Sequence, residues 1–589
     1  MKIHWKWGIL SALVMTLLSL YPQLDILVRE RGHWAGSYAY IDTDEVAYSA
    51  YLQAIIDGRP RRCNPYSGVD PAGGQPSTES LFSIQFAAAY LVAIPARLLH
   101  LSASSVFILL IPLVSAASAL VLYWFLVQVT GHSRIAAAGV LIVLCLPTLV
   151  SAQGPIGLLY WSPHGWSYLT FQRRYLPAIP FPVFLILFGV VWKLLNKTDT
   201  CVIRSLAVGI SIAFLMYSYF FLWTAALAWL TCIGILWLIA RPAERRRTLL
   251  VVAIIYGIVF TALVPFVILL SKRSAEMDSV QALTLSRIPD VTRPSELLST
   301  ALLVVLLLLI RFKRLRLSDP AVLFALSLLA SPLIIFNQQV ITGRELQAFH
   351  YEEFVTSYTF LIALVICWQV FSKNKLIPNS AASRTVTLAM SAFSILYAGI
   401  IVVSLSQAAL DDNLTREQNV RVMARLKELP NPNSGMVMFL NPRLGDSLPT
   451  FSPVPQLWAA HMAVFPGVRP IEVRERFYQY LYYSDVTPLS LHESLMAKNY
   501  MISSALFGFE REAEHLTQQF KPITATDIAD ETRSYEKYVT AFGRSDAARY
   551  PLTYFITCVD SPNANIERWY EKESAEGIGE CVIYQLKLR

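Results

Sequence analysis

Repeated apolar runs are the feature that most constrains the fold of this chain. Most of them have roughly 17 to 25 residues, and an α-helix of about 20 apolar residues crosses the hydrocarbon core of a bilayer. Only 15% of the 589 residues are charged and 55% are hydrophobic, whereas about a quarter of the residues of a soluble domain are charged. The sequence therefore predicts a polytopic α-helical membrane protein. The clear runs are residues 5–21, 104–129, 135–150, 176–195, 206–218, 221–240, 249–270, 297–310, 321–336, 354–371 and 386–405.

The first run resembles a secretory signal peptide, because it is short and begins beside Lys2 and Lys6. No small-residue cleavage site follows it in the stretch YPQLDILVRERGHW. We therefore expect this run to be retained as the first membrane span.

Short basic loops between the runs indicate the orientation of the spans. The run at residues 81–99 decides the arrangement, since it is long enough to span but contains Gln85, Pro95 and Arg97. If it spans, the loops RPAERRR and RFKRLR fall on the side opposite the N-terminal lysines. If it lies at the interface or re-enters, every short basic loop falls on the N-terminal, cytoplasmic side, as the positive-inside rule requires. We take the second arrangement, which gives about eleven spans and places the outer loop at 30–103 and the region after residue 407 on the outer side.

Two neighbouring runs, at residues 206–218 and 221–240, are short and nearly continuous. The aromatic cluster MYSYFFLW lies between them and is typical of a membrane interface. The sequence predicts a tight hairpin at this position, with a single long tilted helix as the alternative.

The composition changes after residue 407. Charged residues become frequent, and the stretches GMVMFLNP, YFITCVDS and CVIYQLKL are typical of short buried strands, with helical stretches among them. We therefore divide the chain into a membrane domain, residues 1–407, and a soluble α/β domain, residues 408–589. Cys558 and Cys581 lie in predicted strands of the second domain, and either a disulfide or two free buried thiols fits them. The seven cysteines form no C-x-x-C motif, so a zinc or redox motif is unsupported.

Three carboxylates, Asp42, Asp44 and Glu45, are packed into four positions after the first run. Crowded carboxylates perturb one another's protonation, and a carboxylate beside an apolar wall serves as a general base. The structural alternative is that Asp44 caps a helix that begins near Glu45. We favour a catalytic role because of this context. The spans hold almost none of the mid-membrane ionisable residues that transporters usually need, which favours a site at the outer interface over a conduction path.

The outer loop that precedes the run at 176–195 reads YWSPHGWSYLTFQRRYLPAIPFP. Arg173 and Arg174 are candidates for binding a phosphate group, because guanidinium groups bind phosphate bidentately. Trp161 and His164 are candidates for substrate binding, since tryptophan rings stack on sugars. An anchor at the membrane interface is the alternative role for this loop.

A second outer loop, NQQVITGRELQAFHYEEF at residues 337–354, carries too many polar residues for a plain connector. Arg344 is a further candidate for binding phosphate. His350 and Glu353 have the spacing of metal ligands on a helix, but one pair is weak evidence, so Mg²⁺ or Mn²⁺ is left open as a cofactor. The candidates for substrate binding in this loop are Gln338, Gln347, His350 and Tyr351.

Carboxylates and arginines at the outer leaflet, between apolar walls, indicate a reaction on a lipid-linked phosphate. A transferase on the outer side of a membrane lacks nucleotide sugars in most cells and needs a lipid-linked donor. Polyprenyl phosphate is a good leaving group that nearby cations stabilise. A base that deprotonates an acceptor hydroxyl then directs attack on the anomeric carbon from the opposite face, with inversion. The net charge of +8 comes from loops between spans and needs no nucleic-acid partner.

The stretch DTDEVAY, residues 42–48, resembles the acidic motif of the protein-mannosyltransferase and aminoarabinose-transferase branch of the GT-C glycosyltransferases. The resemblance covers the architecture of about residues 1–405. It implies that Asp44 is the catalytic residue, supported by Glu45 or Asp42, and that helices at 46–57 and 81–99 lie at the membrane interface. The extra acid at Asp42 departs from the family pattern, as does PSTESLF in place of PPL, and the absence of WWDYG opposes the oligosaccharyltransferase branch.

These observations lead to one leading hypothesis. The chain is expected to be an inverting glycosyltransferase of a bacterial inner membrane that uses a polyprenyl-phosphate-linked sugar and a glycan, lipid or protein acceptor. Asp44 acts as the base and Arg173, Arg174 and Arg344 hold the donor phosphate, while the periplasmic domain binds the acceptor or caps the site. The alternatives are a transporter or flippase for lipid-linked saccharides and a non-catalytic scaffold.

Overall fold

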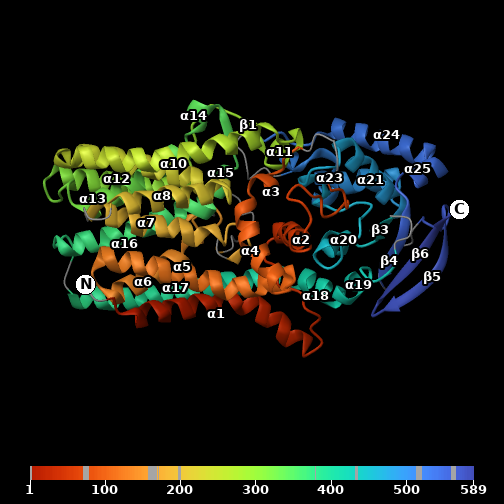
Figure 1. Ribbon diagram of the computed structural model, residues 1–589, viewed down its shortest axis with the longest axis horizontal. Helices are drawn as coiled ribbons and strands as arrows, with labels where there is room; N and C mark the ends of the chain where they lie inside the picture. The colour runs from red at the N-terminus through yellow and green to blue at the C-terminus, as the bar shows by residue number, and fades with distance from the viewer. Residues whose placement is uncertain are drawn as a thin grey trace. The chain divides into compact units, whose positions relative to one another are not determined.

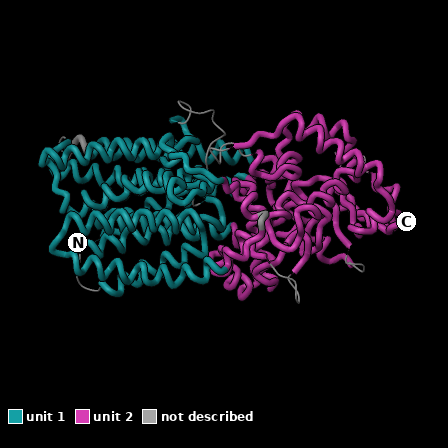
Figure 2. The backbone as a smooth tube through the Cα atoms, turned by 90° about the horizontal axis from the view of Figure 1, so that it is seen from above, with its two compact units in different colours: residues 1–25, 108–268, 285–409 teal, residues 26–107, 269–284, 410–589 magenta. Residues whose placement is uncertain are grey.

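The computed structural model describes residues 3–70, 78–156, 169, 172–196, 201–377, 380–430, 435–512, 520–558 and 565–589. The backbone forms two compact units, shown in different colours in Figure 2. Unit 1 contains residues 1–25, 108–268 and 285–409, and unit 2 contains residues 26–107, 269–284 and 410–589. The predicted outer loop thus packs with the C-terminal region, and the division of the chain at residue 407 stays a prediction.

Unit 1 is a bundle of long helices that run roughly side by side (Figure 1). Short elements connect them: η1 (Pro147–Val150), η4 (Pro242–Glu244), α14 (Gln339–Thr342), β2 (Arg344–Leu346), α15 (Ala348–Tyr351) and the π-helix η5 (Glu352–Thr356). The helices that lie wholly or mostly in this unit are α1 (Trp5–Glu30), α5 (Ala103–Thr130), α6 (Ser133–Cys145), α7 (Pro180–Asn196), α8 (Cys201–Met216), α9 (Phe220–Ala240), α10 (Arg245–Ser271), α12 (Pro294–Arg311), α13 (Pro320–Ile335), α16 (Ser357–Lys373) and α17 (Ser380–Ala408).

The helices establish a polytopic membrane protein. Among the described residues, eight helices are long and apolar enough to cross a membrane. The shorter apolar helices α6, α7 and α8 coincide with predicted spans, so the count of about eleven stays a prediction. α8 ends at Met216 and α9 begins at Phe220, which confirms a break at the aromatic cluster in place of one long helix.

α13 packs against α9, α12 and α16. Among the long helices, α13 and α16 are the most buried, and α10 and α17 are the least. The indole N–H of Trp229 on α9 donates to the Ser327 hydroxyl on α13 at 3.0 Å. The Trp229 ring also meets the Phe324 ring edge to face at 5.4 Å. The exposed apolar faces of α10 and α17 are therefore the faces that lipid covers.

Unit 2 joins the early loop to the C-terminal region. The early part supplies α2 (Asp44–Ile56), α3 (Leu81–Ile84) and α4 (Phe86–Leu98), and the segment 269–284 supplies α11 (Ala275–Val280) and most of β1 (Leu283–Leu285). The predicted run at 81–99 is therefore two helices, α3 and the 13-residue α4. The C-terminal helices are α18 (Leu410–Gln418), α19 (Val420–Arg425), α20 (Pro442–Ser447), η6 (Leu448–Thr450), η7 (Met462–Val464), α21 (Pro470–Tyr483), α22 (Pro488–Met496), α23 (Tyr500–Phe507), η8 (Phe509–Arg511), α24 (Ala525–Ala541) and α25 (Arg544–Arg549).

A four-stranded sheet with the order β3-β4-β6-β5 completes unit 2 (Figure 1). β3 (Met436–Phe439) pairs with β4 (Leu552–Cys558) in parallel, and β6 (Cys581–Leu588) pairs with β4 and β5 (Tyr570–Ile578) in antiparallel fashion. Cys558 and Cys581 face each other in this register and form a disulfide. Three strands were predicted and are confirmed, whereas the mostly exposed β5 was not predicted because YEKESAEGI lacks apolar alternation.

One glycine marks a close approach of two helices in unit 1. A Cβ on Gly189 of α7 would overlap the ring of Trp124 on α5, whereas a Cβ on Gly257 of α10 would meet no atom within 4 Å. We expect Gly189→Ala to lower the unfolding temperature by several degrees, because overpacking costs about 1–3 kcal/mol. The matched variant Gly257→Ala should leave it unchanged or raise it slightly, since alanine favours helices. Thermal unfolding in detergent compares the two, and equal effects would contradict the close approach.

Candidate functional site

The acidic motif lies at the start of α2 in unit 2, and its three carboxylates differ in environment. Glu45 is fully buried, and its carboxylate accepts the N–H of Ile41 at 3.1 Å. Asp42 accepts the N–H of Asp44 at 2.9 Å, so Asp42 satisfies a backbone donor at this helix start. Asp42 and Asp44 are both partly exposed. Glu45 therefore stabilises the turn, and the two aspartates are the carboxylates that solvent or substrate can reach.

Side chains of α18 hold the extended segment that leads into the motif. Asn413 accepts the N–H of Tyr40 at 2.9 Å and donates to its carbonyl at 2.8 Å. Glu417 accepts the N–H of Ser37 at 2.8 Å and also that of Ala35. Both side chains are buried. They supply the backbone partners that an extended strand outside a sheet lacks.

Arg416 completes this contact from the same helix. Its guanidinium donates to the carbonyl of Tyr38 and lies over the rings of Tyr38 and Tyr40, at 4.2 and 4.7 Å from their centroids. Cation–π contacts gain strength when the cation is desolvated, as it is for this buried arginine. We call Asn413, Arg416 and Glu417 the α18 clamp.

α2 is fixed on its other side by α20 and η6, against which it packs. The Ser49 hydroxyl of α2 lies 2.7 Å from the Thr450 hydroxyl of η6. The Tyr38 hydroxyl donates to the Glu45 carbonyl at 2.9 Å and to the Ser49 hydroxyl at 2.8 Å. The backbone around Asp42 and Asp44 is therefore held from both sides.

A further carboxylate, Asp446, contacts a histidine, His461, that lies within electrostatic reach of Asp42 and Asp44. Asp446 of α20 contacts His461 through a 2.6 Å Oδ2–Nδ1 distance and accepts the His461 backbone N–H at 3.1 Å. Their side chains are only 10% and 20% exposed. Burial lowers the pKa of His461, but the charge and hydrogen bond of Asp446, together with the charges of Asp44 and Asp42, raise it to about 9. The imidazole is therefore a cation at neutral pH, within electrostatic reach of both aspartates.

Sequence reasoning missed Asp446 and His461. Asp446 is one of several polar residues in NPRLGD, His461 is a single polar residue in LWAAHM, and neither stretch has a periodic pattern. Only the packing of α20 against α2 joins them to a motif about 400 residues earlier.

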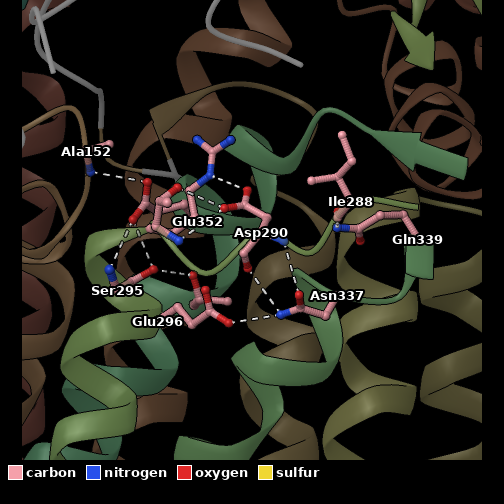
Figure 3. Close-up of polar contacts among 11 residues, drawn as sticks. Ala152, Ile288, Asp290, Ser295, Glu296, Asn337, Gln339 and Glu352 are labelled. Atoms are coloured by element: carbon pink, nitrogen blue, oxygen red, sulfur yellow. Dashed lines mark hydrogen bonds and ion pairs between the residues drawn. The ribbon is translucent and has the colours of Figure 1, made fainter. Parts of the chain in front are cut away.

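Unit 1 contains a separate cluster of buried polar side chains, shown in Figure 3. Asp290 accepts from Arg293 at 2.8 Å, and Asn337 donates to Glu296 at 3.1 Å. The carboxylate of Glu352 accepts the N–H and hydroxyl of Ser295, both at 3.1 Å, and the N–H of Ala152 at 3.2 Å. Glu352 from the π-helix thus binds a free N–H in the first turn of α12.

This cluster includes a predicted loop and an unpredicted one. Asn337 and Glu352 come from the polar loop at 337–354, as does Gln339, which donates to the Ile288 carbonyl at 2.9 Å. Asp290, Arg293 and Glu296 come from the preceding outer loop, where no site was expected. Their contacts pair these buried polar groups with one another, as buried polar groups require.

The predicted residues of unit 1 lie in two environments. Arg173 and Arg174 are buried in the loop before α7. The Arg173 guanidinium lies 5.7 Å from the ring centroid of Phe354, and His350 stacks on the same ring at 5.1 Å. Arg173 and His350 are therefore brought together on Phe354. Tyr351 is also buried, and its hydroxyl lies 2.9 Å from the Thr224 hydroxyl, which is a structural contact.

Arg344, Gln338 and Gln347 belong to the turn around α14 and β2. Arg344 is exposed, and its carbonyl accepts from the Gln338 amide at 2.9 Å. Gln347 is buried and adopts a left-handed backbone, with φ of 36°. Trp161 and His164 lie outside the described residues. Since Asp42, Asp44 and Glu45 belong to unit 2 and the three arginines to unit 1, their convergence stays a prediction.

The described side chains do not form a metal-binding group. Among the residues that the structure describes, no set of three or more His, Cys, Asp or Glu residues is arranged to hold an ion. His350 and Glu353 are only two candidate ligands, so we assign no step to Mg²⁺ or Mn²⁺. Comparison with protein-family models and with curated proteins finds no match for this chain.

Arg293 provides a test of the buried cluster in unit 1. We expect Arg293→Met to destabilise the protein by about 3–5 kcal/mol, because it leaves Asp290 charged and unpaired in the interior. Arg287→Met is the matched control: Arg287 is exposed and donates to the Val340 carbonyl at 2.9 Å, so its loss should cost about 1 kcal/mol or less. Thermal unfolding of both variants checks this, and equal losses would refute the role of the buried pair.

His461 predicts a pH dependence of stability. Its folded-state pKa of about 9 lies above the ordinary value of 6.5, so its stabilising contribution is complete below about pH 6.5 and is lost as the pH rises through 9. The contribution is on the order of 3 kcal/mol, because one pKa unit corresponds to about 1.4 kcal/mol. The unfolding temperature of the wild type should therefore fall between pH 7 and 9.5. That fall should be much smaller in Asp446→Asn, and an identical fall in both proteins would contradict the pairing.

Proposed function

We propose that the protein is an inverting glycosyltransferase that moves a sugar from a polyprenyl-phosphate-linked donor to an acceptor hydroxyl. The observation that carries the proposal is the position of Asp44. It is a partly exposed carboxylate beside Asp42, on a backbone that the α18 clamp and the contacts of Ser49 and Tyr38 hold in place. A general base needs such a fixed and accessible position. The resemblance of DTDEVAY to the GT-C acidic motif and the polytopic helical architecture support the same conclusion.

The proposed reaction proceeds in one displacement. Asp44 accepts the proton of the acceptor hydroxyl, whose oxygen attacks the anomeric carbon as the bond to the phosphate oxygen breaks. The leaving group is polyprenyl phosphate, and the configuration at the anomeric carbon is inverted. Arg173, Arg174 and Arg344 are proposed to bind this phosphate through charge-assisted hydrogen bonds. Trp161, His164, Gln338, Gln347, His350 and Tyr351 are proposed to bind the remainder of the substrates.

We place this chemistry in a bacterial inner membrane, with unit 2 in the periplasm. The disulfide between Cys558 and Cys581 supports an oxidising compartment for this region. The short basic loops between spans support the same orientation through the positive-inside rule.

The test uses purified full-length protein in lipid nanodiscs with a panel of polyprenyl-phosphate sugars. Release of polyprenyl phosphate is measured for the wild type and for Asp44→Asn and Glu45→Gln. We expect Asp44→Asn to lower the rate about 10²- to 10⁴-fold, the usual contribution of a general base, with no change in unfolding temperature. Glu45→Gln tests the supporting role of Glu45, because its amide oxygen can still accept the Ile41 N–H and any loss of rate should then be smaller than in Asp44→Asn.

Three results would oppose the proposal. Equal activity of Asp44→Asn and the wild type would remove Asp44 as the base. Binding of a donor without its cleavage, together with its transfer between leaflets, would establish a flippase. Neither binding nor cleavage of any donor in the panel would remove the donor class.

A further inference from the structure

Two loops of unit 1 expose a group of branched apolar side chains where they meet. The loops are residues 285–293, which lead from the end of β1 to α12, and residues 336–346, which lead from α13 through α14 to β2. We call these two segments the ledge. Its exposed apolar residues are Leu285, Ile288, Val291, Val340 and Ile341. Ile341 is 84% exposed and Leu285 is 74% exposed, and exposed apolar groups of this kind mark interaction surfaces.

Hydrogen bonds join the two segments of the ledge to each other. The Arg287 guanidinium donates to the carbonyls of Val340 and Ile341 at 2.9 and 3.1 Å. The Gln339 amide donates to the Ile288 carbonyl at 2.9 Å, and β1 pairs with β2. The polar groups of the ledge therefore bond across it, while its apolar side chains point away from these contacts.

The ledge connects helices that are long and apolar enough to cross a membrane. α12 begins at Pro294 and α13 ends at Ile335, and both belong to the candidate spans. Figure 1 shows α14 and β1 standing out from one flank of the helix bundle. Leu297 of α12 and Ile334 of α13 are exposed apolar residues next to the ledge. The apolar surface of the ledge thus continues the surface of the bundle that lipid covers.

The backbone of the ledge limits how deeply it can lie in a bilayer. Its two strands have three residues each and α14 has four, so much of its backbone is irregular. Irregular backbone does not face the hydrocarbon core, because its polar groups would lack partners there. The headgroup level suits the ledge, since water reaches the backbone at this depth while apolar side chains enter the lipid.

The exposed charges of the ledge are positive. Both segments are described throughout, and their exposed charged residues are Arg287 and Arg344. The other charged residues of the ledge, Asp290, Arg293 and Glu345, are buried. Guanidinium groups bind phosphate oxygens bidentately, and basic residues near an anionic membrane surface strengthen binding to it. The exposed charge of the ledge therefore complements an anionic headgroup.

We propose that the ledge is a membrane-docking surface at the end of the bundle. Leu285, Ile288 and Ile341 enter the adjacent leaflet, and Arg287 and Arg344 bind the phosphate of an anionic phospholipid. The donor phosphate of the proposed transferase would offer Arg344 the same chemistry, so the experiments distinguish the two lipids. The docking role does not depend on the transferase proposal, and its tests need no enzymatic activity.

The first test measures where the tip of the ledge lies. A nitroxide is attached to Ile341→Cys in full-length protein that carries Cys201→Ser, because the other free cysteines are buried. Collision of the label with oxygen and with a water-soluble nickel chelate is measured in nanodiscs. Val264→Cys on the exposed face of α10 is the lipid reference, and Lys537→Cys on the exposed face of α24 is the water reference.

We expect the label at Ile341 to collide with oxygen nearly as often as the label at Val264. Its collisions with the nickel chelate should be fewer than those of the label at Lys537, since lipid excludes the chelate. Nickel collisions equal to those at Lys537, in nanodiscs with and without anionic lipid, would place the ledge in water and overturn the proposal. Ile341 is so exposed that its replacement should leave the unfolding temperature unchanged.

The second test identifies the lipid. A benzophenone on the same Ile341→Cys protein is photoactivated in nanodiscs of phosphatidylcholine and phosphatidylglycerol, and the captured lipid is identified by mass spectrometry. We expect phosphatidylglycerol to be enriched about fivefold over its share of the bilayer, the usual effect of one arginine near an anionic surface. The enrichment should disappear when Arg287→Gln and Arg344→Gln are combined.

Three outcomes of this capture experiment would contradict the proposal. Capture of no phospholipid would remove the docking surface. Capture of both lipids in their bulk proportions would remove the binding of the headgroup by the arginines. Loss of phosphatidylglycerol capture when an equimolar amount of polyprenyl phosphate is added would assign the ledge to the donor instead.

Discussion

The α18 clamp is the interaction on which unit 2 depends. The segment before the acidic motif is extended but belongs to no sheet, so its N–H and carbonyl groups need partners from elsewhere. Asn413 and Glu417 provide them through side chains that imitate a neighbouring strand. These groups are buried, where an unpaired backbone group costs about 1–3 kcal/mol. Without the clamp, the turn that presents Asp42 and Asp44 would have no fixed starting point.

Unit 1 uses a different solution to a similar problem. The first turn of α12 exposes N–H groups, and Glu352 accepts one of them from the π-helix η5. A π-helical turn carries one more residue per hydrogen-bonded ring than an α-helical turn and so changes the direction of its side chains. Placing a carboxylate at a helix N-terminus also stabilises the helix dipole. The polar loop at 337–354 is thus explained in large part by the need to end and join helices.

The sequence predicts those features that depend on local pattern. Apolar runs located the long helices, and α2 and α3–α4 appeared where helical segments were expected in the outer loop. The polar sites were predicted less completely, because they depend on contacts between distant residues. The sequence assigned Glu45 a role in support of Asp44, and it did not predict that the Glu45 carboxylate accepts the Ile41 N–H. The sequence around Asp446 and His461 does not predict a site, because their contact depends on how α20 packs in the folded chain.

The clamp also has a consequence for how the chain is made. Tyr40 and its partner Asn413 are separated by 373 positions, and a ribosome that adds about 5–20 residues per second needs roughly 20 to 75 s to cover that distance. During this time the helices of unit 1 are synthesised, while the acidic segment lacks its backbone partners from α18. The acidic segment can therefore reach its final arrangement only after α18 has been synthesised. A chain that stalls or is truncated before α18 therefore carries the acidic residues but lacks the clamp that holds them in place.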